Sequence, residues 1–399
     1  MKKILLLSFL FMAIIELKAQ SIPAKAISQT IELQQEMLDS LSARIKNAEI
    51  VGIGEVSHGA LEPILLRTQL IKFLVEKMNF RQILIEMDDA TIRPLNKYLT
   101  NNAPPEKKRF DFLFDSLFNF TEGGAILNNE KFKEQMAWVK DFNMLNPNDM
   151  VSMRGVDISV SFKIIKEIYM DSASVKLMEN EFDNRNIFSR EGYKLIKDWF
   201  IREKENLKIK FGEEGFKNVQ MDVSSYLSDV KYFINGAEKN RAMVTYRDSI
   251  MFKNVVALKT GKSILLAHNG HIGKSDYVLN LFRAKTLGHF LAEAYDDKYY
   301  AILTDYINRA EVTLPKNTRY KNKVFKNSKK TMSYNFKTKQ EFFQLLIFND
   351  DPLLKNLNRF LNIIGIDRGH DVLAGEKNIF DAIVLFKELT PLISDVSNK

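Results

Sequence analysis

Residues 50–59 read Ile-Val-Gly-Ile-Gly-Glu-Val-Ser-His-Gly, an apolar run that ends in a glutamate, a histidine and a glycine. An amphipathic helical pattern follows over residues 61–78, and a second apolar run occupies residues 80–87. Strand, helix and strand in this order are typical of a right-handed crossover between parallel strands. We therefore predict an α/β fold with a mostly parallel sheet flanked by helices. Such sheets place their chemistry outside the carboxyl ends of the strands.

Further apolar runs extend this pattern and divide the chain. They predict strands over residues 150–158, 263–267, 299–305 and 380–386. Residues 159–259, in contrast, are rich in charge and have helical spacing without a strand pattern. We interpret residues 159–259 as a helical insertion that forms a lid or subdomain over the sheet. The α/β domain then consists of residues 20–158 and 260–399.

Helical spacing outside the insertion predicts the elements that cover the sheet. These helices are expected over residues 27–48, 89–100, 131–144, 341–348 and 353–361, in addition to 61–78. Residues 310–337 are polar, basic and only partly β-like, so we expect a mobile flap there.

Residues 1–19 have the pattern of a secretory signal peptide. Lys2 and Lys3 precede an apolar run over residues 4–15, and Ala19 offers a small residue before a cleavage point. The alternative is an uncleaved membrane anchor, but roughly 20 apolar residues are needed to cross the hydrocarbon core. We expect an exported protein, periplasmic or extracellular, without stable membrane insertion.

The composition excludes several classes of chemistry. The chain has no cysteine, which removes disulfides, thiolate nucleophiles and thiolate metal ligands. Its net charge of +8 comes from scattered lysines, and no nucleic-acid-binding module is visible. We therefore expect a solvated basic surface and no nucleic-acid partner, while the sequence leaves the oligomeric state open.

The first histidine motif lies where the strand over residues 50–56 ends. Glu55 and His58 are three residues apart in a glycine-containing turn, so both side chains can face one cleft. A carboxylate paired with a histidine orients the imidazole and raises its basicity. The alternative is a capping glutamate beside a histidine satisfied by the backbone. Ser57 is not in the Gly-x-Ser-x-Gly arrangement of a nucleophilic serine, which favours water as the nucleophile.

Two charged residues could join this pair. Glu86 lies near the end of the next apolar run, where a buried carboxylate requires a partner. We expect the two strands to be adjacent, which would bring Glu86 close to Glu55. Arg67, on the helix between them, could supply the positive charge. The alternatives are a solvated carboxylate at the strand end and an ordinary surface arginine.

The second histidine motif follows the strand over residues 263–267. His268 and His271 flank Asn-Gly and can point into one space, where such a pair binds a metal or transfers a proton. Asp157 also ends a strand and could contact a histidine or the substrate, or cap a helix. His289 is expected to line the pocket near a helix start, and His370, in a polar loop, stays unassigned.

Together these motifs resemble the erythromycin esterase family. The family pattern Gly-Glu-Ala-Thr-His-Gly is similar to residues 54–59, and Ala-His-Asn-x-His is similar to residues 267–271. The first motif departs from the pattern at Val56 and Ser57. The resemblance runs in order from residue 50 to residue 386. Its other matching positions are Arg67, Glu86, Gly155, Asp157 and the Phe-Asp-Ala at residues 380–382.

The resemblance implies a hydrolase that cleaves an ester or lactone without a covalent intermediate and without a cofactor. On this model His58 deprotonates water, Glu55 orients His58, and Glu86 holds the water or a substrate group. His268 and His271 stabilise the oxyanion and assist departure of the alcohol. We assign Arg67, Asp157 and His289 to substrate binding.

Two other functions fit the same residues. One divalent metal ion could be bound by the glutamates and histidines and activate the water, as in a metallohydrolase. Alternatively, the protein could be an exported, non-catalytic binding protein for a small molecule. The insertion and the basic stretch after residue 310 match nothing in the family, so the resemblance does not identify the substrate.

Overall fold

The structure is a computed structural model of the 399-residue chain. It describes residues 35–118, 127–181, 188–279, 282–316, 319–336, 344–355, 357, 360–365, 369–373 and 378–393. The predicted signal peptide and the first part of the helix predicted over residues 27–48 lie outside these residues.

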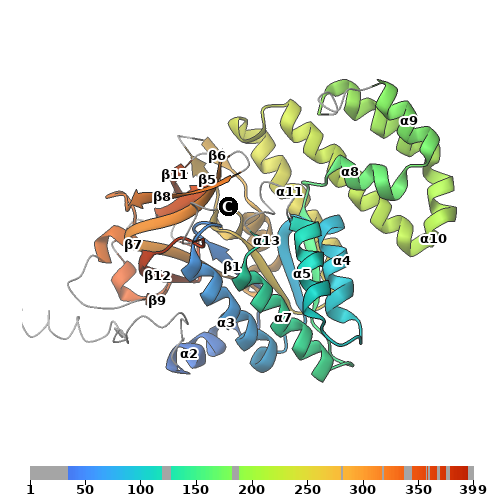
Figure 1. The fold of residues 1–399 in the computed structure, drawn as a ribbon. Helices are drawn as coiled ribbons and strands as arrows, with labels where there is room; N and C mark the ends of the chain where they lie inside the picture. Colours follow the sequence, from blue (N-terminus) through green and yellow to red (C-terminus); the bar gives the residue numbers. More distant parts are fainter. Residues whose placement is uncertain are drawn as a thin grey trace, which may run out of the picture.

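The central sheet has the strand order β3-β2-β4-β1-β7-β12-β9, with β8 paired to the distal part of β7 (Figure 1). From β3 to β12 all neighbouring strands are parallel, and β8 and β9 are antiparallel to their partners. The predicted α/β fold with a mostly parallel sheet is therefore confirmed. The strands are β1 (Ile50–Glu55), β2 (Gln82–Asp88), β3 (Ser152–Asp157), β4 (Ser263–His268), β7 (Tyr299–Lys316), β8 (Arg319–Lys326), β9 (Gln344–Phe348) and β12 (Ala382–Leu389).

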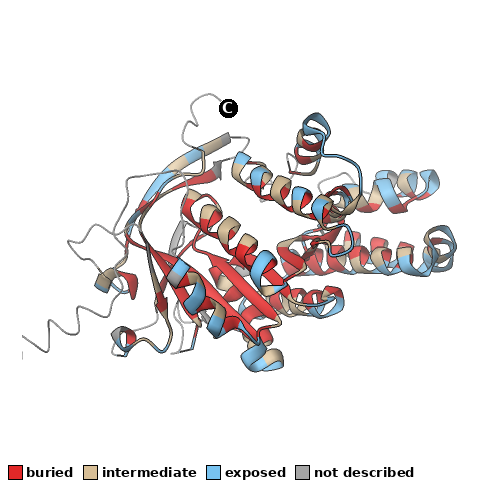
Figure 2. Ribbon diagram, turned by 90° about the horizontal axis from the view of Figure 1, so that it is seen from below, coloured by how far each residue is buried: buried red, intermediate tan, exposed pale blue. Residues whose placement is uncertain are grey.

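Helices cover both faces of this sheet because side chains alternate along each strand. Val51 and Ile53 of β1 pack in the core beneath α2, α3, α4, α5 and α7, whereas Ile50 packs in the core on the α11 and α13 side. Figure 2 shows the buried strands between the outer helices. These helices are α2 (Gln35–Ile45), α3 (Leu61–Met78), α4 (Asp89–Thr100), α5 (Lys107–Phe118), α7 (Glu130–Leu145), α11 (Arg241–Leu258), α12 (Asn269–Ile272) and α13 (Leu287–Tyr295).

Between β3 and β4 the described residues form helices and no strands. The elements before α11 pack in a separate hydrophobic core, which includes Trp199 and Tyr226 together with Ala90 of α4. The longest helix is broken at Gly212, whose φ of 67° lies in the left-handed region that glycine tolerates. Figure 1 shows this unit to one side of the sheet. Its elements before α11 are α8 (Phe162–Ile164), the π-helix η1 (Ile165–Tyr169), α9 (Ser172–Glu181), α10 (Arg190–Ile234) and the 3₁₀ helix η2 (Ala237–Lys239).

The carboxyl-terminal part of the chain differs from the sequence prediction. The helix predicted over residues 341–348 is wrong, because this stretch contains β9, whose residues Leu346 and Ile347 contact opposite cores. The helix predicted over residues 353–361 is also wrong, since among the described residues of this stretch the short η5 (Pro352–Leu354) is followed by β10 (Leu361–Gly365) without an α-helix between them. The alternation of Leu346 and Ile347 between the two cores is the two-residue period of a strand. The remaining elements are β5 (Tyr277–Leu279), β6 (Phe282–Ala284), η3 (Asp296–Lys298), η4 (Ser333–Phe336) and β11 (Gly369–Leu373).

The predicted flap over residues 310–337 is in large part an antiparallel hairpin. β7 continues beyond the parallel sheet to Lys316 and pairs with β8 over the whole length of β8. The side chains of Lys321, Lys323 and Lys326 on β8 are exposed. Val312 and Leu314 of β7 are buried, and their backbones pair with β8. This burial and pairing explain why the basic stretch is ordered.

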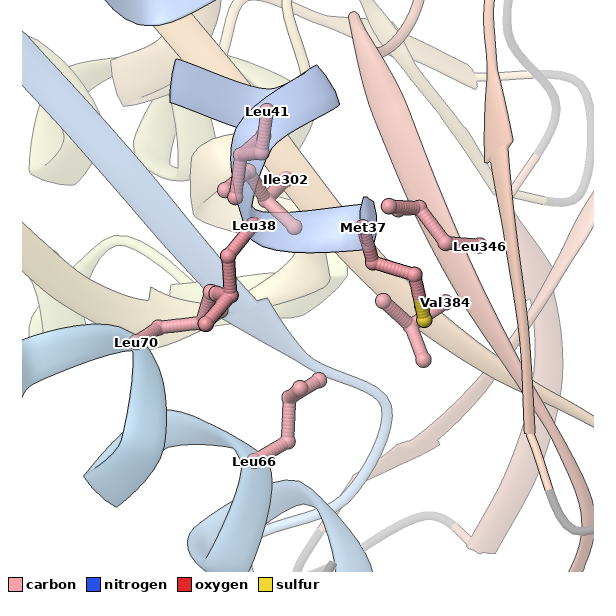
Figure 3. A pocket seen from close by; sticks show the side chains of 8 residues that line it. All are labelled: Met37, Leu38, Leu41, Leu66, Leu70, Ile302, Leu346 and Val384. Atoms are coloured by element: carbon pink, nitrogen blue, oxygen red, sulfur yellow. The ribbon is translucent and has the colours of Figure 1, made fainter. Parts of the chain in front are cut away.

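A small apolar pocket lies between α2, α3 and the sheet (Figure 3). Side chains such as Leu41, Leu70 and Val384 line it, and no titratable group is among the lining residues. It is therefore a packing defect beneath α2 and is unsuited to acid–base chemistry. None of the described helices combines the length and the apolar character required to cross a membrane.

The glycine that ends the first histidine motif is required by a close backbone contact. A Cβ atom added to Gly59 would lie 1.8 Å from the carbonyl oxygen of Thr313 on β7. The backbone NH of Thr313 also donates to the carbonyl of Gly59 at 2.9 Å. The turn after β1 is thus fixed against the β7–β8 hairpin.

Replacement of this glycine tests the contact. Gly59→Ala should lower the free energy of unfolding by about 1–3 kcal/mol, because the backbones must move apart. Urea unfolding measures the effect, and Gly261→Ala is the matched control since a Cβ there meets no atom within 4 Å. Equal stability of the two variants would show that the turn is not held in this way.

Candidate active site

The candidate site lies where four neighbouring parallel strands end. β1 ends at Glu55, β3 at Asp157 and β4 at His268, and Glu86 lies near the end of β2. The predicted adjacency of Glu86 and Glu55 is wrong, because β4 lies between β1 and β2. In the parallel register Glu55 is opposite His268. The error arises because β4, which comes much later in the chain, lies between the two strands. Strands that are consecutive in sequence need not be neighbours in a sheet.

Glu55 and His58 form a direct pair. Nδ1 of His58 lies 2.6 Å from Oε1 of Glu55, and the guanidinium of Arg67 lies 3.6 Å from Oε2. Burial alone would raise the pKa of Glu55, but the hydrogen bond to His58 and the charges of His58 and Arg67 hold this pKa below its usual value. Burial opposes protonation of His58, whereas the hydrogen bond and charge of Glu55 outweigh it and raise the pKa of His58.

The other ring nitrogen of His58 is available for chemistry. Among the described residues no hydrogen bond to Nε2 of His58 is formed, and the side chain is 25% exposed. Ser57, in contrast, is fully buried, and its Oγ accepts a hydrogen bond from the NH of Gly59. The arrangement therefore presents an oriented imidazole, and no serine, to the solvent.

Glu86 is the centre of a second set of charges. Its Oε2 accepts the backbone NH of His268 at 2.8 Å, and its Oε1 lies 3.1 Å from Nε2 of His271 and 3.3 Å from Nη2 of Arg247. Burial would raise the pKa of Glu86, but the charge and hydrogen bond of His271, with the charges of His58 and Arg247, hold it well below its usual value. Glu86 is therefore an anion whose two oxygens are both occupied by protein donors.

His271 lies between two carboxylates. Its Nδ1 is 2.9 Å from Oδ2 of Asp248, opposite its contact with Glu86. Burial opposes the charge of His271, but Asp248 and Glu86 raise its pKa to about 10. His271 is thus protonated at neutral pH. Asp248 also accepts the backbone NH of Leu287 at 2.8 Å, which ties the start of α13 to the site.

His268 differs from His271 in its protonation state. Its Nε2 lies 3.2 Å from the carbonyl of Val56, and its Nδ1 accepts the NH of Gly270 at 3.5 Å. Burial and the neighbouring charge of His58 lower the pKa of His268 to about 4. Its ring centre is 5.1 Å from that of His58. His268 is therefore a neutral ring close to the ring of His58.

Asn269 fixes the loop that carries both histidines. Its amide donates to the carbonyl of Thr304 at 2.6 Å and accepts the NH of Thr304 at 3.3 Å, so it pairs with the backbone of β7. Asn269 is fully buried, and a Cβ added to Gly54 would lie 2.5 Å from its Oδ1. The glycine of the first motif thus makes room for the asparagine of the second.

Arg247 and Asp248 are the site residues that the sequence analysis missed. Arg247 binds Asp157 through two hydrogen bonds of 3.0 and 2.6 Å, and it also reaches Glu86. Both residues lie on α11, within the section assigned to the helical insertion. A signal was present, because Asp248 falls in the buried stripe of α11 with Met251, Val255 and Leu258. A carboxylate on such a stripe requires a buried partner.

Two of the predicted substrate-binding residues have other partners. Asp157 binds Arg247 and the backbone NH of Ile158, and no contact with a histidine is formed among the described residues. His289 lies between Asp276 and Glu293, at 3.0 Å from each, and the structure does not bring it to the His58 cluster. His370 lies in β11.

The metal-dependent alternative requires ligands that converge. Within the described part of the chain, no group of three or more histidine, aspartate or glutamate side chains is arranged to hold a metal ion. The two nitrogens of His271 face opposite carboxylates, and those of His268 face the backbone.

Comparison with protein families identifies a match over the second half of the chain. The model of the erythromycin esterase family matches residues 194–388, a section that includes His268 and His271. It also includes much of the predicted insertion and the basic stretch after residue 310, so the expectation that these parts match nothing in the family is wrong. An erythromycin esterase type I from Escherichia coli is 24% identical over 303 residues, which is 67% of this chain and 73% of the relative. These matches confirm the resemblance to the erythromycin esterase family.

Several solved structures have a similar fold. A protein from Bacillus cereus has a TM-score of 0.69 at 19% identity, over 94% of this chain and 97% of its own. A succinoglycan biosynthesis protein has a TM-score of 0.66 at 19% identity, over 93% and 95%. An erythromycin esterase with one histidine replaced by asparagine, in its open conformation, has a TM-score of 0.64 at 20% identity, over 90% and 95%. At these identities the likeness shows the fold.

The three clustered histidines should titrate separately. We expect His268 to titrate near pH 4, His271 near pH 10, and His58 above the usual value of 6.5, as measured by NMR of the imidazole nitrogens. In Glu55→Gln the pKa of His58 should fall, because the anionic acceptor on Nδ1 is removed, while that of His271 should change little. A His58 titration that is identical in both proteins would contradict the pairing.

Proposed function

We propose, from the premise that the chain is a relative of the erythromycin esterases, that it hydrolyses a carboxylic ester or lactone with water activated by His58. The observation that carries the proposal is the open Nε2 of His58, whose Nδ1 is held by Glu55. A base oriented in this way typically contributes about 10²–10⁴-fold to a rate.

The proposed reaction is a direct attack of water on the ester, without a covalent intermediate. Nε2 of His58 accepts a proton from water as the water oxygen bonds to the ester carbon, and Glu55 stabilises the imidazolium that forms. The resulting tetrahedral oxyanion then expels the alcohol, as the bond between the ester carbon and the alcohol oxygen breaks. His58 returns its proton to the departing oxygen. Arg67 keeps Glu55 ionised through this cycle.

The second set of charges supplies the electrostatic field. His271 and Arg247 are cations beside the anion Glu86, and they are held in place before the substrate arrives. Fixed charges aimed at a developing oxyanion lower the barrier more than mobile solvent does. We assign stabilisation of the oxyanion to the charges of His271 and Arg247. His268, whose nitrogens face the backbone, shapes the space beside His58 and is not assigned a proton transfer.

The proposed setting is outside the cytoplasm. Residues 1–19 have the pattern of a cleaved signal peptide, and the substrate would be a small molecule met in the periplasm or the medium. The chain has no cysteine, so it forms no disulfide in that setting.

Loss of the base is the central test. His58→Asn should lower kcat/KM by at least about 10²–10⁴-fold on any ester or lactone that the wild type hydrolyses, as a screen of chromogenic esters and macrocyclic lactones would measure. Ser57→Ala is the matched control and should retain activity, since the serine is buried and is not the nucleophile. Equal thermal unfolding of the variants excludes a loss of fold.

Other outcomes separate the competing functions. Activity lost in Ser57→Ala but kept in His58→Asn would refute histidine-activated water. Activity that disappears on dialysis against EDTA and returns with a divalent metal would favour the metallohydrolase. Binding of small molecules without turnover in the wild type would favour a binding protein.

Export has its own test. When the full chain is expressed with a functional secretion system, the protein recovered from periplasm or medium should begin at Gln20, as mass spectrometry of the intact protein measures. A retained segment of residues 1–19 would contradict cleavage of a signal peptide.

A further inference from the structure

Val56 is the residue through which three strands hold the turn that carries His58. Its NH donates to Oγ1 of Thr304 on β7 at 3.0 Å. Its carbonyl accepts the NH of Ile364 on β10 at 2.9 Å and lies 3.2 Å from Nε2 of His268 on β4. A single residue separates Val56 from His58, so the placement of the His58 ring depends on where these strands lie.

Of the three strands, β10 is the one that the central sheet does not hold. Among the described strands it pairs with β11, in a separate two-stranded sheet. It contacts the turn through the hydrogen bond to Val56 and through an isolated parallel bridge between Ser57 and Ile364. A two-stranded sheet is only marginally stable by itself. β10 therefore requires other contacts with the domain to stay in register with the turn.

Asp305 on β7 makes such a contact. Its Oδ1 accepts the side-chain amide of Asn362 at 2.8 Å, and its Oδ2 accepts the backbone NH of the same residue at 3.2 Å. Asn362 lies on β10, two residues before Ile364. Asp305 directly follows Thr304 on β7. One carboxylate thus joins the two strands that hold the NH and the carbonyl of Val56.

A buried amide reinforces this contact. Asn327, which follows β8, donates to the carbonyls of Tyr306 and Ile307 on β7 at 3.0 and 2.7 Å. Its Oδ1 accepts the side-chain amide of Asn362 at 2.9 Å. Hydrogen bonds in such a buried network rigidify the segments that they join. β10 is therefore attached to β7 both directly and through this amide.

The donors around Asp305 are uncharged. Besides Asn362, they are the backbone NH of Tyr306 at 2.7 Å and the hydroxyl of Ser333 at 2.9 Å, and no described residue forms an ion pair with Asp305. Burial raises the pKa of Asp305 to about 7, against the effect of these donors. A fully buried carboxylate without a cation is costly, and an apolar residue would avoid that cost. The cost indicates that the directed hydrogen bonds of this residue have a use.

We propose that Asp305 is a positioning residue for His58, because it holds β10 against the turn after β1. The inference rests on the proposed function, since it concerns the base of that reaction. The imidazole must present Nε2 to the water while Glu55 holds Nδ1 at 2.6 Å. Movement of β10 would release the carbonyl of Val56 and let the turn shift. A misplacement of about 1 Å can lower a rate by about 10²-fold.

The protonation of His58 tests the inference without any hydrolysis. In Asp305→Asn the pKa of His58, measured by NMR of the imidazole nitrogens, should fall, because a shifted turn weakens the hydrogen bond to Glu55. Asn362→Ala removes one of the donors and keeps the carboxylate of Asp305. It should therefore lower the pKa of His58 in the same direction, without any change of charge.

Asp381→Asn is the matched control. Its carboxylate also accepts a backbone NH of β7, that of Ala301 at 2.7 Å, but near the start of the strand. This variant should leave the pKa of His58 unchanged. Ser333→Ala removes one uncharged donor from Asp305 and should lower the pKa of His58 by less than Asn362→Ala does. These two donor variants decide the question where Asp305→Asn does not fold.

Kinetics separate positioning from a loss of stability. In folded Asp305→Asn, kcat on any ester that the wild type hydrolyses should fall by about 10–10²-fold. KM should change by less than about twofold, because no contact with the substrate is removed. A loss of stability alone would lower the amount of active protein and leave the pKa of His58 in the folded molecules as in the wild type.

An unchanged pKa of His58 and an unchanged kcat in Asp305→Asn would overturn the inference. A lower pKa in Asp305→Asn that is absent from Asn362→Ala would also overturn it, because the removal of charge would then explain the effect. The proposed function fails in a different way. Absence of hydrolysis in the wild type, with a lower pKa of His58 in both variants, would contradict the esterase and leave the positioning of His58 standing.

Discussion

The ionised state of Glu86 is the constraint on which the carboxyl edge of the sheet depends. A carboxylate enclosed by protein is costly unless donors surround it. Its donors are the NH of His268, the ring of His271 and the guanidinium of Arg247, which belong to β4, α12 and α11. The donors that neutralise Glu86 therefore connect the strand ends to the helical section between β3 and β4.

The same constraint gives the three histidines different states. His271 is charged because it lies between Glu86 and Asp248, and His268 is neutral because it is buried and lies near the charge of His58. His58 has one carboxylate on one side and an open nitrogen on the other. A site that performs acid–base chemistry needs neighbouring groups with separated pKa values, and here the separation follows from the number of carboxylates that each ring contacts.

Local patterns in the sequence predicted the elements formed by neighbouring residues. The helices α3 and α4 begin and end where their periodicity does, and both histidine motifs lie at strand ends. Strand order was not predictable in the same way, because β4 enters between β1 and β2 from residue 263. Arg247 was missed for a related reason, since its partners Asp157 and Glu86 are distant in sequence. The apolar run of β9 was mistaken for a helix because short runs fit both periods.

In the hairpin of β7 and β8, β8 is an edge strand that other copies of this protein can approach. Among the described strands β8 pairs only with β7. The NH and carbonyl groups on its other side could therefore pair with a strand of another molecule. The exposed Lys321, Lys323 and Lys326 lie along it. Like charges repel when two such edges approach, and lysines at sheet edges are a common protection against aggregation. The basic composition of this stretch thus helps to keep crowded molecules apart.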